Sequence, residues 1–436
     1  MQRRDFVKGL AAAAAVVKVF PEASEALEQQ VERLRADVGA ATDDVHLWRR
    51  VRREFSLNPG VVHFNCGSIG AMPRVVIDAV CGQVRRFEAN PYDGAFDNAV
   101  AVRKKAADFL GAAIDEVALT RNTTEGMDCV ATGLHLIEGD EVLTTNHEHG
   151  GGMICWQYLV KHHGVRMRYL KLPKIVKDTA QILELVEQNI TERTRACSFS
   201  HVDTITGMQM PLAVISALTR PKGILLVCDG AQAPGMLDVD VKALGVDTYA
   251  SSSHKWMLAP RGSGLLYIRK EVQDRVQPVM FHQVSGEGQD YNAYGASSGT
   301  RNMANIHGHG VAMDFHNAIG RARIEGRCRA LSRLVRERLR AIPALTPLTP
   351  EQEELSSAIV SFALDPARGK NSDIVTRFRE EYNTILKPAQ GTLPFVPAEH
   401  VPPPHDNYNA IRVSTHIFNN EDEVERMAER MAAMLA

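Results

Sequence analysis

Between residues 116 and 268, short apolar runs alternate with helical stretches. This alternation is typical of βαβ units, in which helices join parallel strands and cover both faces of the sheet. The sequence therefore predicts an α/β fold with a mostly parallel seven-stranded sheet. The seven candidate strands are Glu116–Thr120, Glu141–Thr145, Arg166–Leu170, Ala196–His201, Ile224–Asp229, Thr248–Ser252 and Gly264–Ile268.

The length of the chain, 436 residues, is more than one compact core usually holds, so we expect more than one domain. Apolar residues keep helical spacing from Leu27 to Phe55, which predicts an N-terminal helical arm. A helical stretch from about Ile306 to Ala341, followed by shorter apolar runs, predicts a smaller α+β domain. The expected division is an arm over 27–58, a large domain over 59–305 and a small C-terminal domain over 306–436.

Composition excludes several classes of function. A formal net charge of -2 gives no field that would gather nucleic acid. The seven cysteines are scattered singly, so neither a zinc site nor a disulfide framework is predicted, and we expect no bound metal. The apolar run Gly9–Val17 is far shorter than the roughly 20 residues that cross a bilayer. We therefore expect no nucleic-acid partner and no membrane segment.

The N-terminus carries Arg3-Arg4-Asp5-Phe6-Val7-Lys8 before that alanine-rich run. This pattern resembles a twin-arginine export signal, with a small-residue cleavage point near Ser24-Glu25-Ala26. It predicts a signal over 1–26 and a periplasmic protein. The alternative is a cytoplasmic protein that begins with a basic, alanine-rich helix.

A lysine and an aspartate follow two of the candidate strands. Lys255 comes after the run that ends in Ser251-Ser252-Ser253-His254, and Asp229 ends the run that begins at Ile224. A lysine at the end of a buried strand is costly unless it is neutral or covalently used. A buried carboxylate needs a cationic partner, and a protonated pyridine nitrogen supplies one. The pair predicts a pyridoxal phosphate (PLP) enzyme in which Lys255 holds the cofactor as an imine.

A third candidate element is Arg121-Asn122-Thr123-Thr124-Glu125-Gly126, where a strand leads into a helix. Free backbone N–H groups and the helix dipole favour a phosphate there, although an ordinary helix cap has the same residues. Ser252, His254 and Thr300 are further candidates for donors to this phosphate. The proline-rich segment Lys387–His405 is expected to be a loop beside the site.

Four motifs together resemble the class V aminotransferase family of fold-type-I PLP enzymes, which includes cysteine desulfurases and isopenicillin N epimerase. They occur in the family's order over about residues 64–418. The motifs are Ser200-His-Val-Asp-Thr-Ile-Thr-Gly207, Asp229-Gly-Ala-Gln232, Ser252-Ser-His-Lys255 and Ile411-Arg-Val-Ser-Thr-His-Ile-Phe-Asn419.

The resemblance implies a role for each matching residue. Lys255 would bind the cofactor covalently, Asp229 its ring nitrogen and Gln232 its phenolic oxygen, while His149 would stack on the ring. Thr123, Thr124, Ser252 and His254 would hold the phosphate, with Thr300 reaching across from the other subunit of a homodimer. Arg412 would bind the α-carboxylate of the substrate, a task for which lysine is a poor substitute. Asn65 would line the substrate side.

Two departures matter for the function. Residues 329–436 contain no cysteine, whereas desulfurases carry a catalytic cysteine before the carboxylate-binding arginine, so desulfuration is disfavoured. Thr204, a further candidate for a cofactor contact, stands where desulfurases have an asparagine, and how it would contact the cofactor is left open. Arg121-Asn-Thr-Thr-Glu-Gly126 and Asp229-Gly-Ala-Gln-Ala-Pro-Gly-Met-Leu237 look more like the epimerase branch.

The sequence thus predicts a PLP enzyme acting on an amino-acid-like substrate, with Lys255 as the base that removes the α-proton. Transamination and epimerisation both remain open; epimerisation needs a second proton carrier, such as His149 or His147. If the chain is exported, a third enzymatic possibility is the tailoring of a peptide siderophore such as pyoverdine. A different class of hypothesis is a non-catalytic protein that uses the fold for binding.

Overall fold

The computed structural model describes residues 21–41, 43–91, 97–277, 301–389 and 408–436. Most of the expected export signal, Thr300 and most of the predicted loop Lys387–His405 lie outside these residues.

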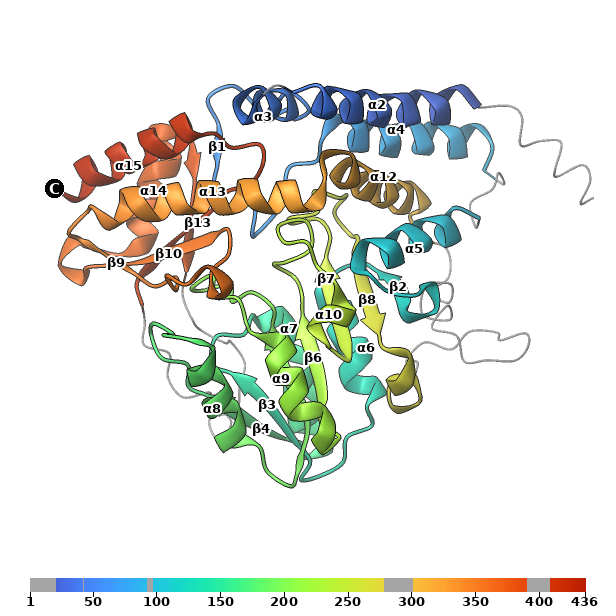
Figure 1. The fold of residues 1–436 in the computed structure, drawn as a ribbon, viewed down its shortest axis with the longest axis vertical. Coiled ribbons are helices and arrows are strands. Elements are labelled where there is room, and N and C mark those ends of the chain that lie inside the picture. The colour runs from blue at the N-terminus through green and yellow to red at the C-terminus, as the bar shows by residue number, and fades with distance from the viewer. Residues whose placement is uncertain (1–20, 42, 92–96, 278–300, 390–407) are drawn as a thin grey trace, which may run out of the picture.

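A seven-stranded sheet forms the centre of the molecule (Figure 1). The strand order is β2-β8-β7-β6-β5-β3-β4, and β8 alone runs against its neighbours. The predicted fold class, with a mostly parallel seven-stranded sheet, is confirmed. The strands are β2 (Val117–Thr120), β3 (Glu141–Thr145), β4 (Arg166–Leu170), β5 (Thr194–Ser200), β6 (Leu225–Asp229), β7 (Thr248–Ser252) and β8 (Gly264–Ile268).

Helices cover both faces of this sheet, and its strands are apolar for that reason. Successive side chains of a strand point to opposite faces. In β6, Leu225 and Val227 therefore pack under α6 and α7, while Leu226 and Cys228 join the core on the side of α8 and α9. The covering helices are α6 (Thr123–Gly133) and α7 (Gly150–His163) on one face, and α8 (Thr179–Asn189), α9 (Leu212–Thr219) and α10 (Val241–Leu244) on the other.

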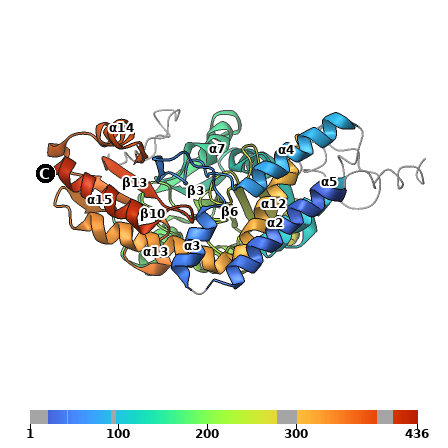
Figure 2. The same cartoon turned by 90° about the horizontal axis from the view of Figure 1, so that it is seen from above.

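A layer of helices lies together on one side of the molecule (Figure 2), and one of them contacts the edge strand β2. The arm folds as two helices, and the first of them packs against α4 and α12. Most of α12 was assigned to the small domain by the sequence, yet it packs against α4 and α5 of the large domain. These helices are α2 (Pro21–Gly39), α3 (Asp44–Arg52), α4 (Arg74–Ala89), α5 (Asp97–Leu110) and α12 (Met303–Ile319).

The C-terminal part is built on a four-stranded antiparallel sheet, ordered β12-β13-β10-β9. The long helical stretch predicted before it is two helices, because Gly320 breaks it with a φ of 98°. Its elements are α13 (Arg321–Arg340), β9 (Leu345–Pro347), β10 (Ile359–Leu364), α14 (Asn371–Tyr382), β12 (Lys387–Ala389), β13 (Ala410–Ser414) and α15 (Glu421–Leu435).

One segment assigned to the large domain by the sequence joins the C-terminal part instead. β1 (Val62–His63) pairs in parallel with β11 (Thr384–Ile385), and Asn65 bridges to Ser414 at the end of β13. Phe64 is fully buried in the core of the C-terminal part. The chain therefore contacts the C-terminal part before it enters the seven-stranded sheet, which brings Asn65 and Ser68 beside Arg412.

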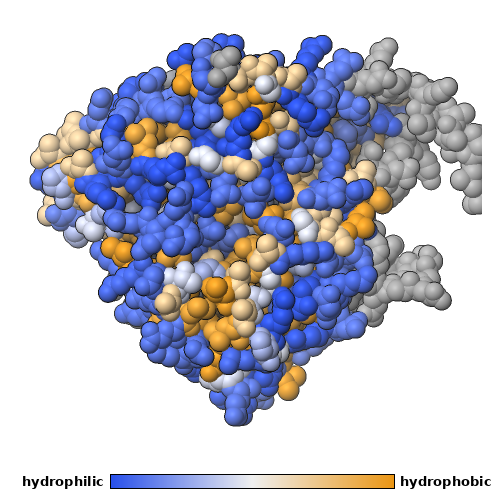
Figure 3. Space-filling view, viewed as in Figure 1, coloured by the Kyte–Doolittle hydropathy of each residue, from blue (hydrophilic) through white to orange (hydrophobic). Residues whose placement is uncertain are grey.

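The face shown in Figure 3 is mostly hydrophilic, with apolar side chains in separate groups. Within the described ranges, no helix combines the length and the apolar character that crossing a membrane requires.

Candidate active site

The carboxyl ends of β6 and β7 bring the predicted aspartate and lysine to one edge of the sheet. The two strands are parallel neighbours, with Asp229 paired to Ala250 in register. Asp229 is the last residue of β6, and Lys255 follows the end of β7 by three positions. Ligands bind at this edge in open α/β sheets. The structure therefore brings the two residues together where a ligand is expected.

Lys255 is held in a partly buried position by a close backbone contact. Gly70 N donates a 2.9 Å hydrogen bond to the carbonyl of His254, and a Cβ atom at Gly70 would lie 2.0 Å from the carbonyl oxygen of Lys255. Burial lowers the pKa of the Lys255 amine to about 8; the charge of Asp229 opposes this shift and that of Arg412 adds to it. A substantial fraction of the amine is therefore neutral near pH 8.

The Asp229 carboxylate is buried, with 5% of the residue exposed. Its Oδ1 accepts a 2.9 Å hydrogen bond from the Ala231 N–H. A Cβ atom at Gly152 would lie 2.4 Å from Oδ2, so the α7 backbone can approach only because residue 152 is a glycine. No described residue donates a hydrogen bond to Oδ2. A buried carboxylate oxygen that accepts no hydrogen bond from the protein is suited to bind a cationic ligand.

The start of α6 meets the end of β7 at the predicted phosphate site. Thr123 lies at this start, where its backbone N–H and its hydroxyl contact the Ser252 hydroxyl at 2.9 and 2.8 Å. Asn122 caps the helix by accepting from the Glu125 N–H. His254 Nδ1 is buried without a hydrogen-bond partner in the described structure. Thr124 Oγ1 faces Gly151, at 2.7 Å from the position of a Cβ atom there. Thr123 and Ser252 thus supply donors at a helix N-terminus, and His254 follows Ser252 by two positions.

His149 lies between β3 and α7 and caps α7, since its Nδ1 accepts a 3.0 Å hydrogen bond from the Gly151 N–H. The residue is exposed in the structure. Desolvation by its neighbours and the charge of Lys255 lower the pKa of its imidazole, and the charge of Asp229 opposes them. His149 is therefore close to both residues, and its ring is neutral at neutral pH.

Arg412 is a buried guanidinium on β13, with 3% of the residue exposed. Its Nη2 donates to Asn65 Oδ1 at 3.0 Å and to Ser68 Oγ at 3.2 Å. Its Nη1 donates to the hydroxyl and the carbonyl of Thr204, at 2.6 and 3.0 Å. Thr204 thus holds the arginine, which gives this residue a position that the sequence left open.

The charge of Arg412 is not matched by a carboxylate among the residues that the structure describes. Burial lowers its pKa to about 10, while the charges of Asp203 and Cys66 act in the other direction. A buried guanidinium of this kind is suited to bind an incoming anion.

Gln232 lies between the Lys255 side of the site and the Arg412 side. Its Nε2 donates to the Gly67 carbonyl at 2.8 Å, and its Oε1 accepts from the indole of Trp256 at 2.8 Å. A Cβ atom at Gly67 would lie 3.1 Å from Gln232 Oε1 and 3.3 Å from Arg412 Nη2. The Gln232 amide therefore lies close to Arg412, and Gly67 is required by the narrow space between them.

Sequence reasoning missed the buried acidic residues behind this site. Glu148 accepts from the Thr145 hydroxyl at 2.7 Å and from the Ser200 N–H at 3.0 Å. Desolvation, supported by the charges of Asp229 and Asp203, raises the pKa of Glu148 to about 7. The signal was the polar run after a buried strand, Asn146-His-Glu-His149. Neighbouring side chains of this run point in different directions: Glu148 is buried, whereas His149 is exposed.

The arrangement fits pyridoxal phosphate. Asp229 Oδ2, to which no described residue donates a hydrogen bond, suits a ring N–H. The start of α6, where the Thr123 N–H and hydroxyl contact Ser252, favours a phosphate. The partly neutral amine of Lys255 suits imine formation.

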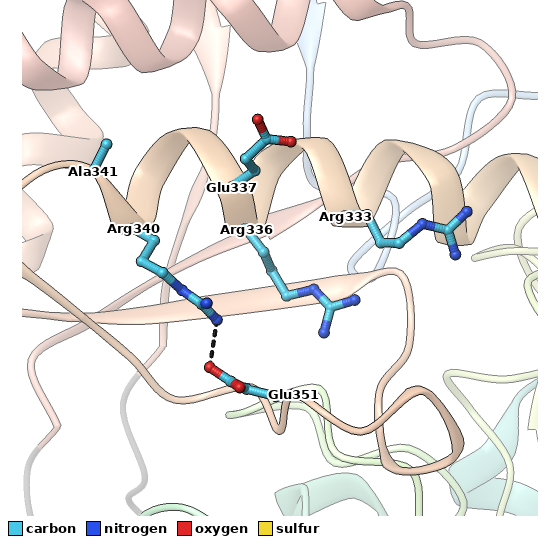
Figure 4. A pocket seen from close by; sticks show the side chains of 6 residues that line it. All are labelled: Arg333, Arg336, Glu337, Arg340, Ala341 and Glu351. Atoms are coloured by element: carbon cyan, nitrogen blue, oxygen red, sulfur yellow. Dashed lines mark hydrogen bonds and ion pairs between the residues drawn. The ribbon is translucent and has the colours of Figure 1, made fainter.

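A separate hollow of about 480 Å³ lies between α13 and the segment that carries Glu351 (Figure 4). It shares no residue with the site above, and the Arg340–Glu351 ion pair of 2.6 Å crosses it. Its lining residues are Arg333, Arg336, Glu337, Arg340, Ala341 and Glu351.

Comparison with known proteins places these residues in a family context. The model of the family described as "Aminotransferase class-V" matches residues 71–427. An isopenicillin N epimerase from Amycolatopsis lactamdurans is 32% identical over 407 residues, which cover 88% of this chain and 98% of that protein. A probable cysteine desulfurase from Methanothermobacter thermautotrophicus is 28% identical, with 87% and 96% covered.

Solved structures share the fold. The apo structure of a cysteine desulfurase from Thermococcus onnurineus superposes with a TM-score of 0.75 at 23% identity, covering 89% of this chain and 98% of that chain. A second structure, of the enzyme C-DES with glycine covalently linked to its PLP cofactor, has a TM-score of 0.74 at 23% identity and covers 87% and 98%.

Proposed function

Because the chain belongs to the class V aminotransferase family, whose cofactor is pyridoxal phosphate, we propose that it is an epimerase acting at the α-carbon of an amino-acid-like substrate. The observation that carries the substrate class is the buried guanidinium of Arg412, which lies near the Lys255 amine and lacks a carboxylate partner in the described structure. A substrate α-carboxylate would supply that partner and place the α-carbon beside the amine.

Each residue of the site has a task in this proposal. When bound, pyridoxal phosphate supplies an electron-withdrawing ring that stabilises negative charge at the α-carbon. Asp229 would hold the ring nitrogen in its protonated state, and Thr123, Ser252 and His254 would hold the phosphate. Arg412, positioned by Thr204 and Asn65, would fix the carboxylate. The Lys255 amine, with its pKa near 8, is suited to accept the α-proton near neutral pH.

Epimerisation differs from transamination in where the proton returns. We assign the second proton transfer to His149, because its neutral imidazole lies near Lys255 and Asp229. Support for epimerisation also comes from the relatives, since two isopenicillin N epimerases match this chain at 32% and 30% identity over 88% and 89% of its length. The absence of any cysteine after Cys328 in the sequence argues against desulfuration.

The test follows the α-hydrogen of a panel of L-amino acids in deuterated water, with the cofactor-loaded protein. Epimerisation predicts loss of the α-hydrogen NMR signal and formation of the D-enantiomer without keto acid. A keto acid with accumulation of the pyridoxamine form would assign the chain as an aminotransferase instead, and sulfide from cysteine would assign it as a desulfurase. Lys255→Ala protein is the matched control and should show no exchange.

We also propose that the protein is a homodimer, in which Thr300 of one subunit contributes to the phosphate site of the other. Light scattering of the loaded protein should give twice the chain mass. Mixing Thr300→Ala subunits with Lys255→Ala subunits should then leave mixed dimers with one intact site. A monomeric protein with full activity would contradict this assembly.

A further inference from the structure

His147 is a buried histidine that the proposed function does not yet use. Its Nδ1 lies 2.9 Å from Asp203 Oδ2 and its Nε2 lies 3.2 Å from the hydroxyl of Tyr408. Only 3% of the residue is exposed. Asp203 is equally buried and also accepts hydrogen bonds from the Ile205 N–H and the Thr206 hydroxyl. The imidazole is thus held at both nitrogens, so its position is fixed.

Asp203 is the link between His147 and the proposed carboxylate site. It directly precedes Thr204, whose carbonyl and hydroxyl both accept from Arg412. The negative charge of Asp203 acts on the Arg412 guanidinium and works against the lowering of its pKa. An unpaired carboxylate at this position would cancel part of the charge that Arg412 offers to a substrate.

We propose that His147 is a positioning residue for substrate binding: its protonated ring pairs with Asp203 and so leaves the charge of Arg412 available to a substrate carboxylate. The inference rests on the proposed role of Arg412 and adds a residue that acts on Arg412 through Asp203. With Asp203 and His147 both charged, the pair is neutral and Arg412 keeps its full attraction for an anion. With His147 neutral, the carboxylate of Asp203 opposes the substrate.

The groups around His147 define its expected pH dependence. Desolvation lowers its pKa, but the charge and hydrogen bond of Asp203, with the charge of Glu148, outweigh it and raise the pKa above the ordinary 6.5. Tyr408 contributes a neutral hydroxyl. Carboxylate binding should therefore be strongest at low pH and weaken as pH rises through the raised pKa of His147. Glu148, with a pKa of about 7, gains negative charge over the same range.

A pair of probes isolates the carboxylate. Norvaline and butylamine carry the same side chain and amine, but butylamine lacks the carboxylate. The ratio of their dissociation constants, from spectral titration of the cofactor-loaded protein, measures what the carboxylate adds to binding. Effects of Lys255 on imine formation are common to both probes and cancel in this ratio.

The decisive variant is His147→Asn, whose amide can still donate to Asp203 from the Nδ1 position but carries no charge. We expect the norvaline advantage to fall by roughly tenfold at pH 7, the order of effect of one nearby unit charge. Adding Asp203→Asn to the same protein should restore the advantage, because it removes the opposing carboxylate. If His147 had only a structural role, Asp203→Asn would not restore the norvaline advantage that His147→Asn had lost.

The pH profile supplies the second test. The norvaline advantage of the unsubstituted protein should decline as pH rises through the raised pKa of His147. The decline should be steeper than in His147→Asn, where Glu148 and Lys255 still titrate. A profile equally steep in both proteins, or an unchanged advantage in His147→Asn, would overturn the inference. If the variant fails to fold, a flat profile in the unsubstituted protein overturns it.

Arg412→Lys separates this inference from the function on which it rests. If Arg412→Lys keeps the full norvaline advantage, Arg412 does not bind the carboxylate and the proposed function fails with it. If Arg412→Lys loses the advantage and His147→Asn keeps it, the carboxylate site stands and only the role of His147 is wrong.

Discussion

The backbone N–H and the hydroxyl of Thr123 both meet the hydroxyl of Ser252, at 2.9 and 2.8 Å. This contact ties the first residue of α6 to the last residue of β7, although 129 positions separate them in sequence. It places the free N–H groups of a helix start beside the strand that leads to Lys255. The same hydroxyl is therefore expected to serve both the fold and the phosphate.

Ser252→Ala tests this double role. The substitution leaves the buried Thr123 N–H without its acceptor, so the cofactor-free protein should lose about 1–3 kcal/mol in free energy of unfolding, measured with denaturant. Cofactor affinity should fall as well. Ser251→Ala is the matched control, because the Ser251 side chain points to the other face of β7 and its buried hydroxyl has no partner in the described residues. Equal losses in both variants would contradict the assignment.

Asp229→Asn should slow α-hydrogen exchange by about 10²–10³-fold, the usual effect of removing one preorganised electrostatic group. The amide keeps the size of the carboxylate but does not hold a positive charge on the ring nitrogen. Exchange is followed by NMR in deuterated water. The control is Asp274→Asn, which makes the same carboxylate-to-amide replacement at an exposed position. A rate within a few fold of the unsubstituted protein would show that Asp229 does not act on the cofactor.

Glu148 gives stability a defined pH dependence. Its pKa is raised from 4.5 to about 7 in the folded protein, so the folded state holds a proton that the unfolded state has lost between these values. Stability should therefore fall as pH rises from about 4.5 to about 7. Glu148→Gln remains neutral, and its free energy of unfolding relative to the parent should increase across this range and then level off. A constant difference over the whole range would show that the pKa of Glu148 is the same in the folded and unfolded states.

Export stays a proposal that rests on Arg3 and Arg4, outside the described residues. Residues 1–40 fused to a reporter that folds before export should deliver the reporter to the periplasm. The same fusion with Arg3→Lys and Arg4→Lys should remain in the cytoplasm, since lysine keeps the charge and removes the paired guanidinium groups. A reporter found only in the cytoplasm in both cases removes the claim.

Much of the central fold was predictable because its signals are local. Four predicted strands, including Glu141–Thr145 and Thr248–Ser252, have the bounds that the structure gives them. Three of the four, β3, β7 and β8, are fully buried runs with both faces covered. The fourth, β4, is an edge strand whose side chains are mostly half-buried. The reversed direction of β8 was not predicted, because strand direction depends on pairing with β2 and β7 rather than on its own residues.

The site was predictable in its residues and less so in its contacts. Asp229 and Lys255 carry a strong motif in the sequence, and the structure brings them to one edge of the sheet. The contact between Arg412 and Thr204 joins positions 208 residues apart, and no local pattern announces it. His147 was named only as a possible proton carrier. Its pairing with Asp203 depends on how the ends of β3 and β5 meet, which requires the folded chain.

Reduction of the cofactor-loaded protein with borohydride identifies the lysine that holds the cofactor. The reagent fixes an imine between cofactor and lysine, and mass spectrometry of the digested protein then locates the modified residue. We expect a single modified peptide, which contains Lys255, and loss of the visible absorption band on reduction. The Lys255→Ala protein should carry no such modification. A cofactor adduct on another lysine, or an unchanged adduct in Lys255→Ala, would contradict this expectation.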